Sequence, residues 1–186
     1  MAKHTRLVFP ANLIGPQILL LSYIVIFGDN DGAKWFITFI DDRSRICWVY
    51  LLKEKSEVFQ TFKKFYLMIK NQFQTSIKIL RTDNGSEYIN VVLGEFLSSN
   101  GIIHQKSCVD TPQQNGVAER KNRHLLEVAR SLIFSMNVRK LHQGDAILTA
   151  AYLINRMPSK VFNFKNSHCR FSCFIPKFPN LPRFTN

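Results

Sequence analysis

Residues 35–52 read WFITFIDDRSRICWVYLL, and this stretch sets the layout of the fold. Two runs rich in β-branched and aromatic residues, 35–40 and 46–52, flank the polar segment 41–45. Such a pattern predicts a β-hairpin. Asp41 and Asp42 fall in its turn, where aspartates usually bond backbone amides, and we expect that role for both.

A helix and a second strand unit follow the hairpin. Apolar side chains recur in 58–73 at spacings of one, three and four residues, which predicts an amphipathic helix with its lysines turned outward. Ser56 is the expected N-cap of this helix. The run 77–82 predicts a strand that ends at the turn residues Asp83-Asn84-Gly85. Asp83 is therefore expected at the carboxyl end of a strand.

Shorter patterns complete the chain. The apolar run 18–27 predicts a buried strand and is too short to cross a bilayer. The later elements expected are a helix at about 92–99 ending at Asn100-Gly101, a strand at 102–107, a polar loop at 111–116, a long helix from Val117 and a helix at 146–156. Because strands and helices alternate in this order, we expect an α/β fold of packed layers.

The composition bounds the class of protein. With 186 residues, 46% of them hydrophobic, the chain is long enough for one globular domain. Lys and Arg number 25 against 13 acidic residues, so the net charge is +12, which favours an anionic partner and nucleic acid first. Charge that serves only solubility stays an alternative. The scattered cysteines and the lack of a secretory pattern lead us to expect an intracellular protein with free thiols.

Two acidic residues stand in motifs that point to a specific chemistry. Asp83 closes a strand and Glu119 opens a helix, with 119 − 83 − 1 = 35 residues between them. Segments 81–88 (RTDNGSEY) and 111–123 (TPQQNGVAERKNR), with the hairpin, resemble the integrase core of copia-type retrotransposons. The resemblance extends over 36–160 and marks the chain as a degenerate fragment of such a core.

The resemblance implies a fold and an activity. The implied fold is ribonuclease-H-like, with a mixed five-stranded sheet flanked by helices over 1–160 and an irregular tail over 161–186. The implied activity is DNA integration, namely 3′ processing and strand transfer of transposon ends by an Asp, Asp, Glu triad that binds Mg²⁺ or Mn²⁺. Such ions prefer hard oxygen ligands, and two of them stabilise both the attacking and the leaving oxygens. Asp83 and Glu119 are the implied catalytic residues and metal ligands.

The first triad position departs from the family. The family opens with an Asp, a hydrophobic pair and Gly-Pro, whereas the matching stretch here is Asn12-Leu13-Ile14-Gly15-Pro16. An amide in place of a carboxylate removes a negative charge and two lone-pair sites. We therefore expect weakened metal binding and impaired catalysis, which leaves the chain's status as an enzyme open. We do not expect Asp41 or Asp42 to replace the missing ligand.

DNA contacts are expected around the start of the long helix. At 100° per residue, Glu119, Asn122 and Arg123 fall near one face, beside the apolar face. The predicted DNA-binding residues are Asn115, Arg120, Lys121, Asn122 and Arg123. The alternative is a solvated basic helix face.

Partners and competing functions follow from the same motifs. The resemblance implies transposon ends and target DNA as partners, a homo-oligomer and a nuclear location, with no membrane. The competing hypothesis is a non-catalytic nucleic-acid-binding remnant of a transposon. A ribonuclease H relative is disfavoured by the 35-residue gap and by the motif around Glu119.

Overall fold

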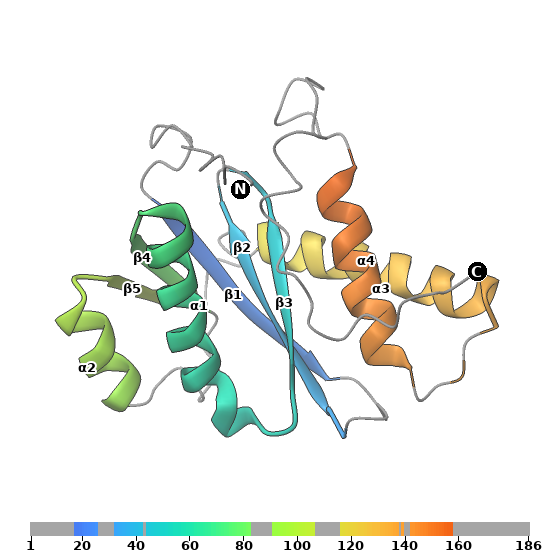
Figure 1. Ribbon diagram of the computed structural model, residues 1–186, viewed down its shortest axis with the longest axis horizontal. Helices are drawn as coiled ribbons and strands as arrows, with labels where there is room; N and C mark the ends of the chain where they lie inside the picture. Colours follow the sequence, from blue (N-terminus) through green and yellow to red (C-terminus); the bar gives the residue numbers. More distant parts are fainter. Residues whose placement is uncertain are drawn as a thin grey trace, which may run out of the picture.

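A computed structural model describes residues 17–25, 32–42, 44–82, 91–106, 116–137, 139 and 142–157, and of residues 17–25 it describes the backbone (Figure 1). The tail expected over 161–186 lies outside these residues. The described elements are β1 (Gln17–Val25), β2 (Trp35–Asp41), β3 (Cys47–Leu52), the 3₁₀ turn η2 (Lys55–Glu57), α1 (Val58–Phe73), β4 (Ile77–Thr82), α2 (Val91–Ser99), β5 (Ile103–Lys106), α3 (Gly116–Ser135) and α4 (Gln143–Arg156).

The described strands form one mixed sheet in the order β3-β2-β1-β4-β5. β1 pairs with β2 and β2 with β3 in antiparallel fashion, as the predicted hairpin requires. β4 lies parallel to β1 on one side and to β5 on the other. β1 is thus the central strand, and it joins the hairpin to β4, whose last described residue is Thr82.

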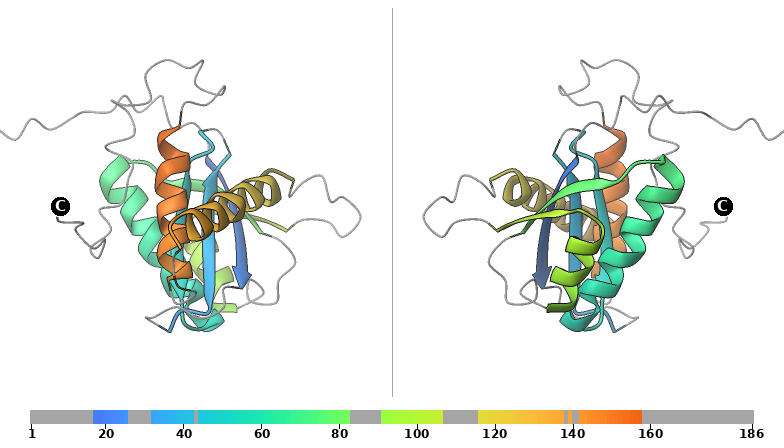
Figure 2. Two further views of the ribbon diagram at one scale, coloured as in Figure 1. Left: turned by 90° about the vertical axis from the view of Figure 1, so that its right-hand side faces the viewer. Right: turned by 90° about the vertical axis from the view of Figure 1, so that its left-hand side faces the viewer.

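Helices cover both faces of the sheet (Figures 1 and 2). The alternation of β2 sends Ile37 and Phe39 into a core with α1 and α2, and sends Phe36 and Ile40 into a second core with α3 and α4. The two cores make a three-layer arrangement of helices, sheet and helices. The expected α/β fold of packed layers is confirmed.

Aromatic residues fill the core beneath α1. The rings of Phe39 and Phe65 stack with their centroids 4.4 Å apart, and Trp48 meets Phe65 edge-on at 5.3 Å. Each fully buried phenylalanine contributes about 1.5–3 kcal/mol through removal of apolar surface from water. The helix expected over 58–73 from apolar spacing is confirmed, because that spacing supplies this face.

The expected N-cap of α1 is wrong. Glu57 precedes the helix as its cap residue, and its carboxylate accepts hydrogen bonds from the backbone N–H of Lys53 (2.8 Å) and Glu54 (3.4 Å). Ser56 lies inside η2 and donates to the Glu54 carboxylate at 3.0 Å. A glutamate side chain reaches the preceding N–H groups that the shorter serine does not, so the chain enters α1 through a 3₁₀ turn.

The edge of the sheet at β3 is held by a side chain of α4. Asn155 accepts a hydrogen bond from the backbone N–H of Cys47 at 3.0 Å and donates one to its carbonyl oxygen at 2.6 Å. The amide thereby satisfies strand groups that have no neighbouring strand. Among the described helices, none is long and apolar enough to cross a membrane.

Candidate functional site

The carboxyl end of β4 is fixed by a contact with β5. Thr82 is the last described residue of β4, and its buried hydroxyl lies 2.9 Å from Nε2 of His104. Burial lowers the pKa of His104, and the neighbouring Lys106 lowers it further. The ring is therefore held in its neutral form, which suits a hydrogen bond to a neutral hydroxyl. Asp83 follows Thr82 directly in the chain and lies outside the described residues.

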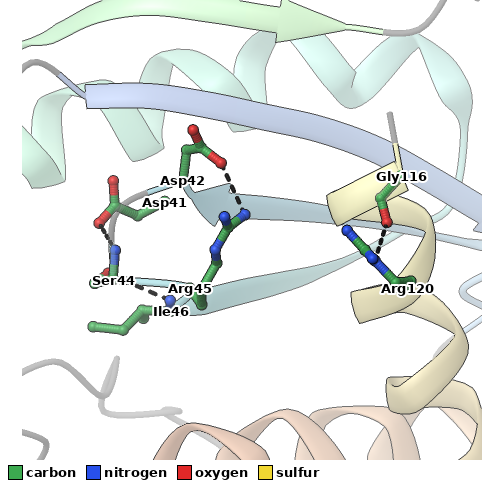
Figure 3. Close-up of polar contacts among 7 residues, drawn as sticks. All are labelled: Asp41, Asp42, Ser44, Arg45, Ile46, Gly116 and Arg120. Carbon is green, nitrogen blue, oxygen red and sulfur yellow. Dashed lines mark hydrogen bonds and ion pairs between the residues drawn. The ribbon is translucent and has the colours of Figure 1, made fainter. Parts of the chain in front are cut away.

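The start of α3 carries the second predicted acidic residue. Glu119 is exposed and lies in the first turn of the helix, where the helix dipole favours a negative charge. Arg120 is exposed, and its Nε donates to the carbonyl oxygen of Gly116 at 2.8 Å (Figure 3). Arg123 is also exposed, one turn further along. One carboxylate and two arginines therefore face solvent at this end of the helix.

A buried hydrogen bond attaches α3 to the centre of the sheet. The hydroxyl of Thr38 on β2 donates to Oδ1 of Asn122 at 3.0 Å, and both side chains are buried. Thr38 pairs in register with Ser22 of β1, and α3 also contacts β1. Glu119 lies one helical turn before Asn122. The bond between Thr38 and Asn122 therefore holds the helical turn that contains Glu119 close to the central strand.

The same bond gives Asn122 a structural role in the fold. Its side chain is only 3% exposed and bonds to the sheet, and the DNA contact predicted for it stays a prediction. The predicted helix places Asn122 beside the apolar face of α3. The part of α3 that the sheet covers is wide enough to include Asn122. Lys121 is half-buried: burial is the main cause that lowers its pKa, Cys47 opposes the shift and Arg45 adds to it. It is thus less accessible than Arg120 or Arg123.

The hairpin turn has a structural role. Asp41 is buried, and its Oδ2 accepts a hydrogen bond from the backbone N–H of Ser44 at 2.9 Å (Figure 3). Asp42 forms an ion pair with Arg45 at 2.8 Å, and Arg45 adopts the left-handed φ of 59°. The expected bonding to a backbone amide is confirmed for Asp41, whereas the carboxylate of Asp42 pairs with the side chain of Arg45.

Three predicted site residues, Asn12, Asp83 and Asn115, lie outside the described residues. The neighbours of β4 in the sheet are β1 and β5, and β1 spans Gln17–Val25. Sequence reasoning also missed the contacts of Thr38 and His104, because a single threonine or histidine within a strand carries no local signal of its partner.

The described residues fit a divalent cation poorly. They hold no group of three or more His, Cys, Asp or Glu side chains that is placed to bind a metal ion. The described residues of β1, Gln17–Val25, contain none of these four residue types. Glu119 supplies one carboxylate at the start of α3. Mg²⁺ and Mn²⁺ require more oxygen ligands than this.

Comparisons with known proteins agree on one family. A sequence profile described as "Integrase core domain" matches residues 22–112. The chain is 48% identical over 134 residues, 72% of its length, to the "Retrovirus-related Pol polyprotein from transposon TNT 1-94" of Nicotiana tabacum. It is 37% identical over 154 residues, 83% of its length, to the corresponding polyprotein from transposon RE2 of Arabidopsis thaliana. It spans 10% of the length of each of these relatives.

The fold has a solved counterpart. A chain in the "CryoEM structure of simian T-cell lymphotropic virus intasome in complex with PP2A regulatory subunit B56 gamma" superposes with a TM-score of 0.64 at 18% identity. The match covers 93% of this chain and 59% of that chain, which shows a shared ribonuclease-H-like fold. With the profile and the plant relatives, it establishes that the chain belongs to the integrase core family of retrotransposon Pol polyproteins.

Proposed function

We propose that this chain is the integrase core of a copia-type retrotransposon, which binds transposon-end and target DNA and is impaired in 3′ processing and strand transfer. One observation carries the proposal. The first two turns of α3 present Glu119, Arg120 and Arg123 to solvent on a helix that is bonded to the centre of the sheet. A helix anchored to the sheet therefore displays one carboxylate beside two exposed arginines.

Charge and spacing on α3 suit a DNA backbone. Arg123 and Arg130 are both exposed and seven residues apart, which is about 10 Å along a helix at ~1.5 Å per residue. The net charge of +12 adds an attractive field over the whole chain. Arginines form charge-assisted hydrogen bonds with phosphate oxygens, and they release counterions when they bind DNA. Binding to DNA is therefore expected to weaken as salt rises.

Impairment follows from the poor set of metal ligands. In the integrase core family, divalent ions, Mg²⁺ or Mn²⁺, supply the positive charge that stabilises the attacking and leaving oxygens. Here the central strand, over its described residues Gln17–Val25, offers no carboxylate for such an ion. The residues of this chain can still position a phosphodiester, through Arg120 and Arg123. The same observation favours the second candidate, a non-catalytic nucleic-acid-binding remnant of a transposon.

A binding titration tests the DNA-binding part. The affinity for a short donor-end duplex is measured by fluorescence anisotropy over a series of salt concentrations. Arg123→Ala is expected to lower the affinity and to reduce the salt slope by about one unit, as for the loss of one phosphate contact. Lys63→Ala is the matched control, because Lys63 is exposed on α1 at the opposite face of the sheet. Equal losses in both variants, or no salt-dependent binding at all, contradict the proposal.

Two further assays test catalysis and assembly. Strand transfer of donor ends with Mg²⁺ or Mn²⁺ is expected to give no product, and clear product would overturn the proposed impairment. Sedimentation with donor DNA is expected to show a homo-oligomer, since integration joins two DNA ends at once. A strictly monomeric complex at all concentrations would count against the oligomer.

A further inference from the structure

β4 and β5 extend the sheet beyond the part that packs against α3 and α4. The core beneath these two helices is built with residues of β2 and β3, and no described residue of β4 or β5 belongs to it. In Figure 1, α4 lies beside β3, while β4 and β5 lie at the other end of the sheet. One face of β4 and β5 therefore lies outside the hydrophobic cores of the described residues.

The alternation of β4 places an arginine on this face. Leu80 packs in the core with α1 and α2, so its neighbours Ile79 and Arg81 point the opposite way. β5 pairs Ile103 with Ile79 and Gln105 with Arg81, and paired residues of neighbouring strands share a face. These four residues form the open β4–β5 face. Ile103 is 60% exposed, and the other three side chains are half-buried.

The guanidinium group of Arg81 is held in place by Gln105. The side-chain oxygen Oε1 of Gln105 accepts a hydrogen bond from Nε of Arg81 at 3.3 Å and another from Nη2 at 3.0 Å. Two bonds to one oxygen fix the plane of the guanidinium. Because an arginine carries five N–H donors, others remain for a further acceptor. The fold thus orders the side chain before any ligand binds, which reduces the entropy that binding costs.

The charge of Arg81 is not balanced by a carboxylate. The ion pairs among the described residues do not include Arg81, and its bonded partner is a neutral amide. β4 reads IKILRT and β5 reads IHQK, so both strands carry basic residues and neither carries an acidic one. A half-buried cation without a counter-charge attracts an anion more strongly than a fully solvated one. The open β4–β5 face is therefore complementary to an anionic ligand.

A DNA strand matches both the charge and the apolar surface of this face. A phosphate accepts two parallel hydrogen bonds from a guanidinium. Ile103 offers exposed apolar surface on the same face, which suits the deoxyribose beside that phosphate and has no use for an inorganic anion. We propose that Arg81 binds a backbone phosphate of DNA on the open β4–β5 face, with Gln105 as the residue that positions it. This inference rests on the proposed function and extends the DNA contacts from α3 to the sheet.

Gln105→Glu tests the inference with almost no change of shape. A carboxylate keeps the two hydrogen bonds to Arg81 but neutralises its charge. Affinity of the full chain for a short donor-end duplex, measured by fluorescence anisotropy, is expected to fall about tenfold or more. The salt slope is expected to fall by about one unit, as for one lost phosphate contact. Tm is expected to equal or exceed that of the parent, since an ion pair replaces a neutral contact.

Two further variants isolate the contact. Gln60→Glu makes the same change of charge at an exposed position of α1, on the other face of the sheet, and is expected to leave the affinity close to that of the parent. Arg81→Lys keeps the positive charge but replaces the planar fork with a single ammonium group. It is expected to lower the affinity while leaving the salt slope nearly unchanged.

The outcomes separate this inference from the proposed function. Equal affinities in Gln105→Glu and Gln60→Glu, with Arg123→Ala still weakened, overturn the inference and leave the proposed function standing. Parent-like affinity in Arg81→Lys overturns the two-pronged phosphate contact. A fall in Tm that accompanies the loss of affinity in Gln105→Glu overturns the positioning role, because Gln105 then only supports the fold. No salt-dependent DNA binding by the parent chain refutes the proposed function and this inference together.

Discussion

Asn122 and Arg123 are neighbours in the chain, and the structure buries the side chain of Asn122 and exposes that of Arg123. Asn122→Ala removes the buried acceptor of the Thr38 hydroxyl, a bond of 3.0 Å. Leaving one buried hydrogen bond unmade costs about 1–3 kcal/mol, and ~1 kcal/mol lowers Tm by about 2–4 °C in a domain of this size. We therefore expect Tm to fall by roughly 2–12 °C. Affinity for DNA, measured well below Tm, is expected to stay unchanged.

Arg123→Ala is the matched comparison. Its side chain is exposed on a helix, so the substitution is expected to change stability by less than about 0.5 kcal/mol while lowering DNA affinity. Thermal unfolding followed by circular dichroism and anisotropy with donor DNA give both quantities for each variant. If Asn122→Ala keeps its Tm and loses as much DNA affinity as Arg123→Ala, the buried contact is not what holds Asn122. The assignment of roles would then be refuted.

Three further predictions concern stability. Asn155→Ala is expected to lower the free energy of unfolding by about 1–3 kcal/mol, through loss of its two bonds to the Cys47 backbone; an unchanged urea midpoint would contradict this. Burial raises the pKa of Cys47 from 9.0 to about 12, against a smaller opposite effect of Lys121, and burial raises that of Tyr50 from 10.0 to about 12. Since folding favours the protonated forms of both groups, their contribution to the free energy of unfolding is fully present below pH 9 and is lost as pH rises toward 12. Urea titrations at several alkaline pH values measure this free energy, and no fall would refute the prediction. Because burial lowers the pKa of His104 below 6.5, its contribution to the free energy of unfolding is fully present above that pH and is lost as pH drops beneath it. His104→Gln is expected to lessen this acid sensitivity. An identical pH profile in the variant would contradict the role given to His104.

Much of the fold follows from local patterns. The hairpin, the helix over 58–73 and the strand over 77–82 are each specified by the spacing of their own apolar residues, and the structure has all three. The cap predicted for α1 is wrong, because a 3₁₀ turn over Lys55–Glu57 precedes the helix and places Glu57, one residue after Ser56, at the cap position. Contacts such as Thr82 with His104 join residues 22 positions apart, and no local pattern specifies such a pair.

The sequence by itself determined the family and the two acidic motifs around Asp83 and Glu119, because spacing and residue identity are properties of the chain. Tertiary structure decided that Asn122 is buried while Arg123 is exposed, since the angle of a residue on a helix does not tell how wide a strip the sheet covers. It also decided which strand lies beside β4. The motif that marked Asn12 is local, whereas the pairing of Leu21 with Thr82 is set by hydrogen bonds between strands that are far apart in the sequence.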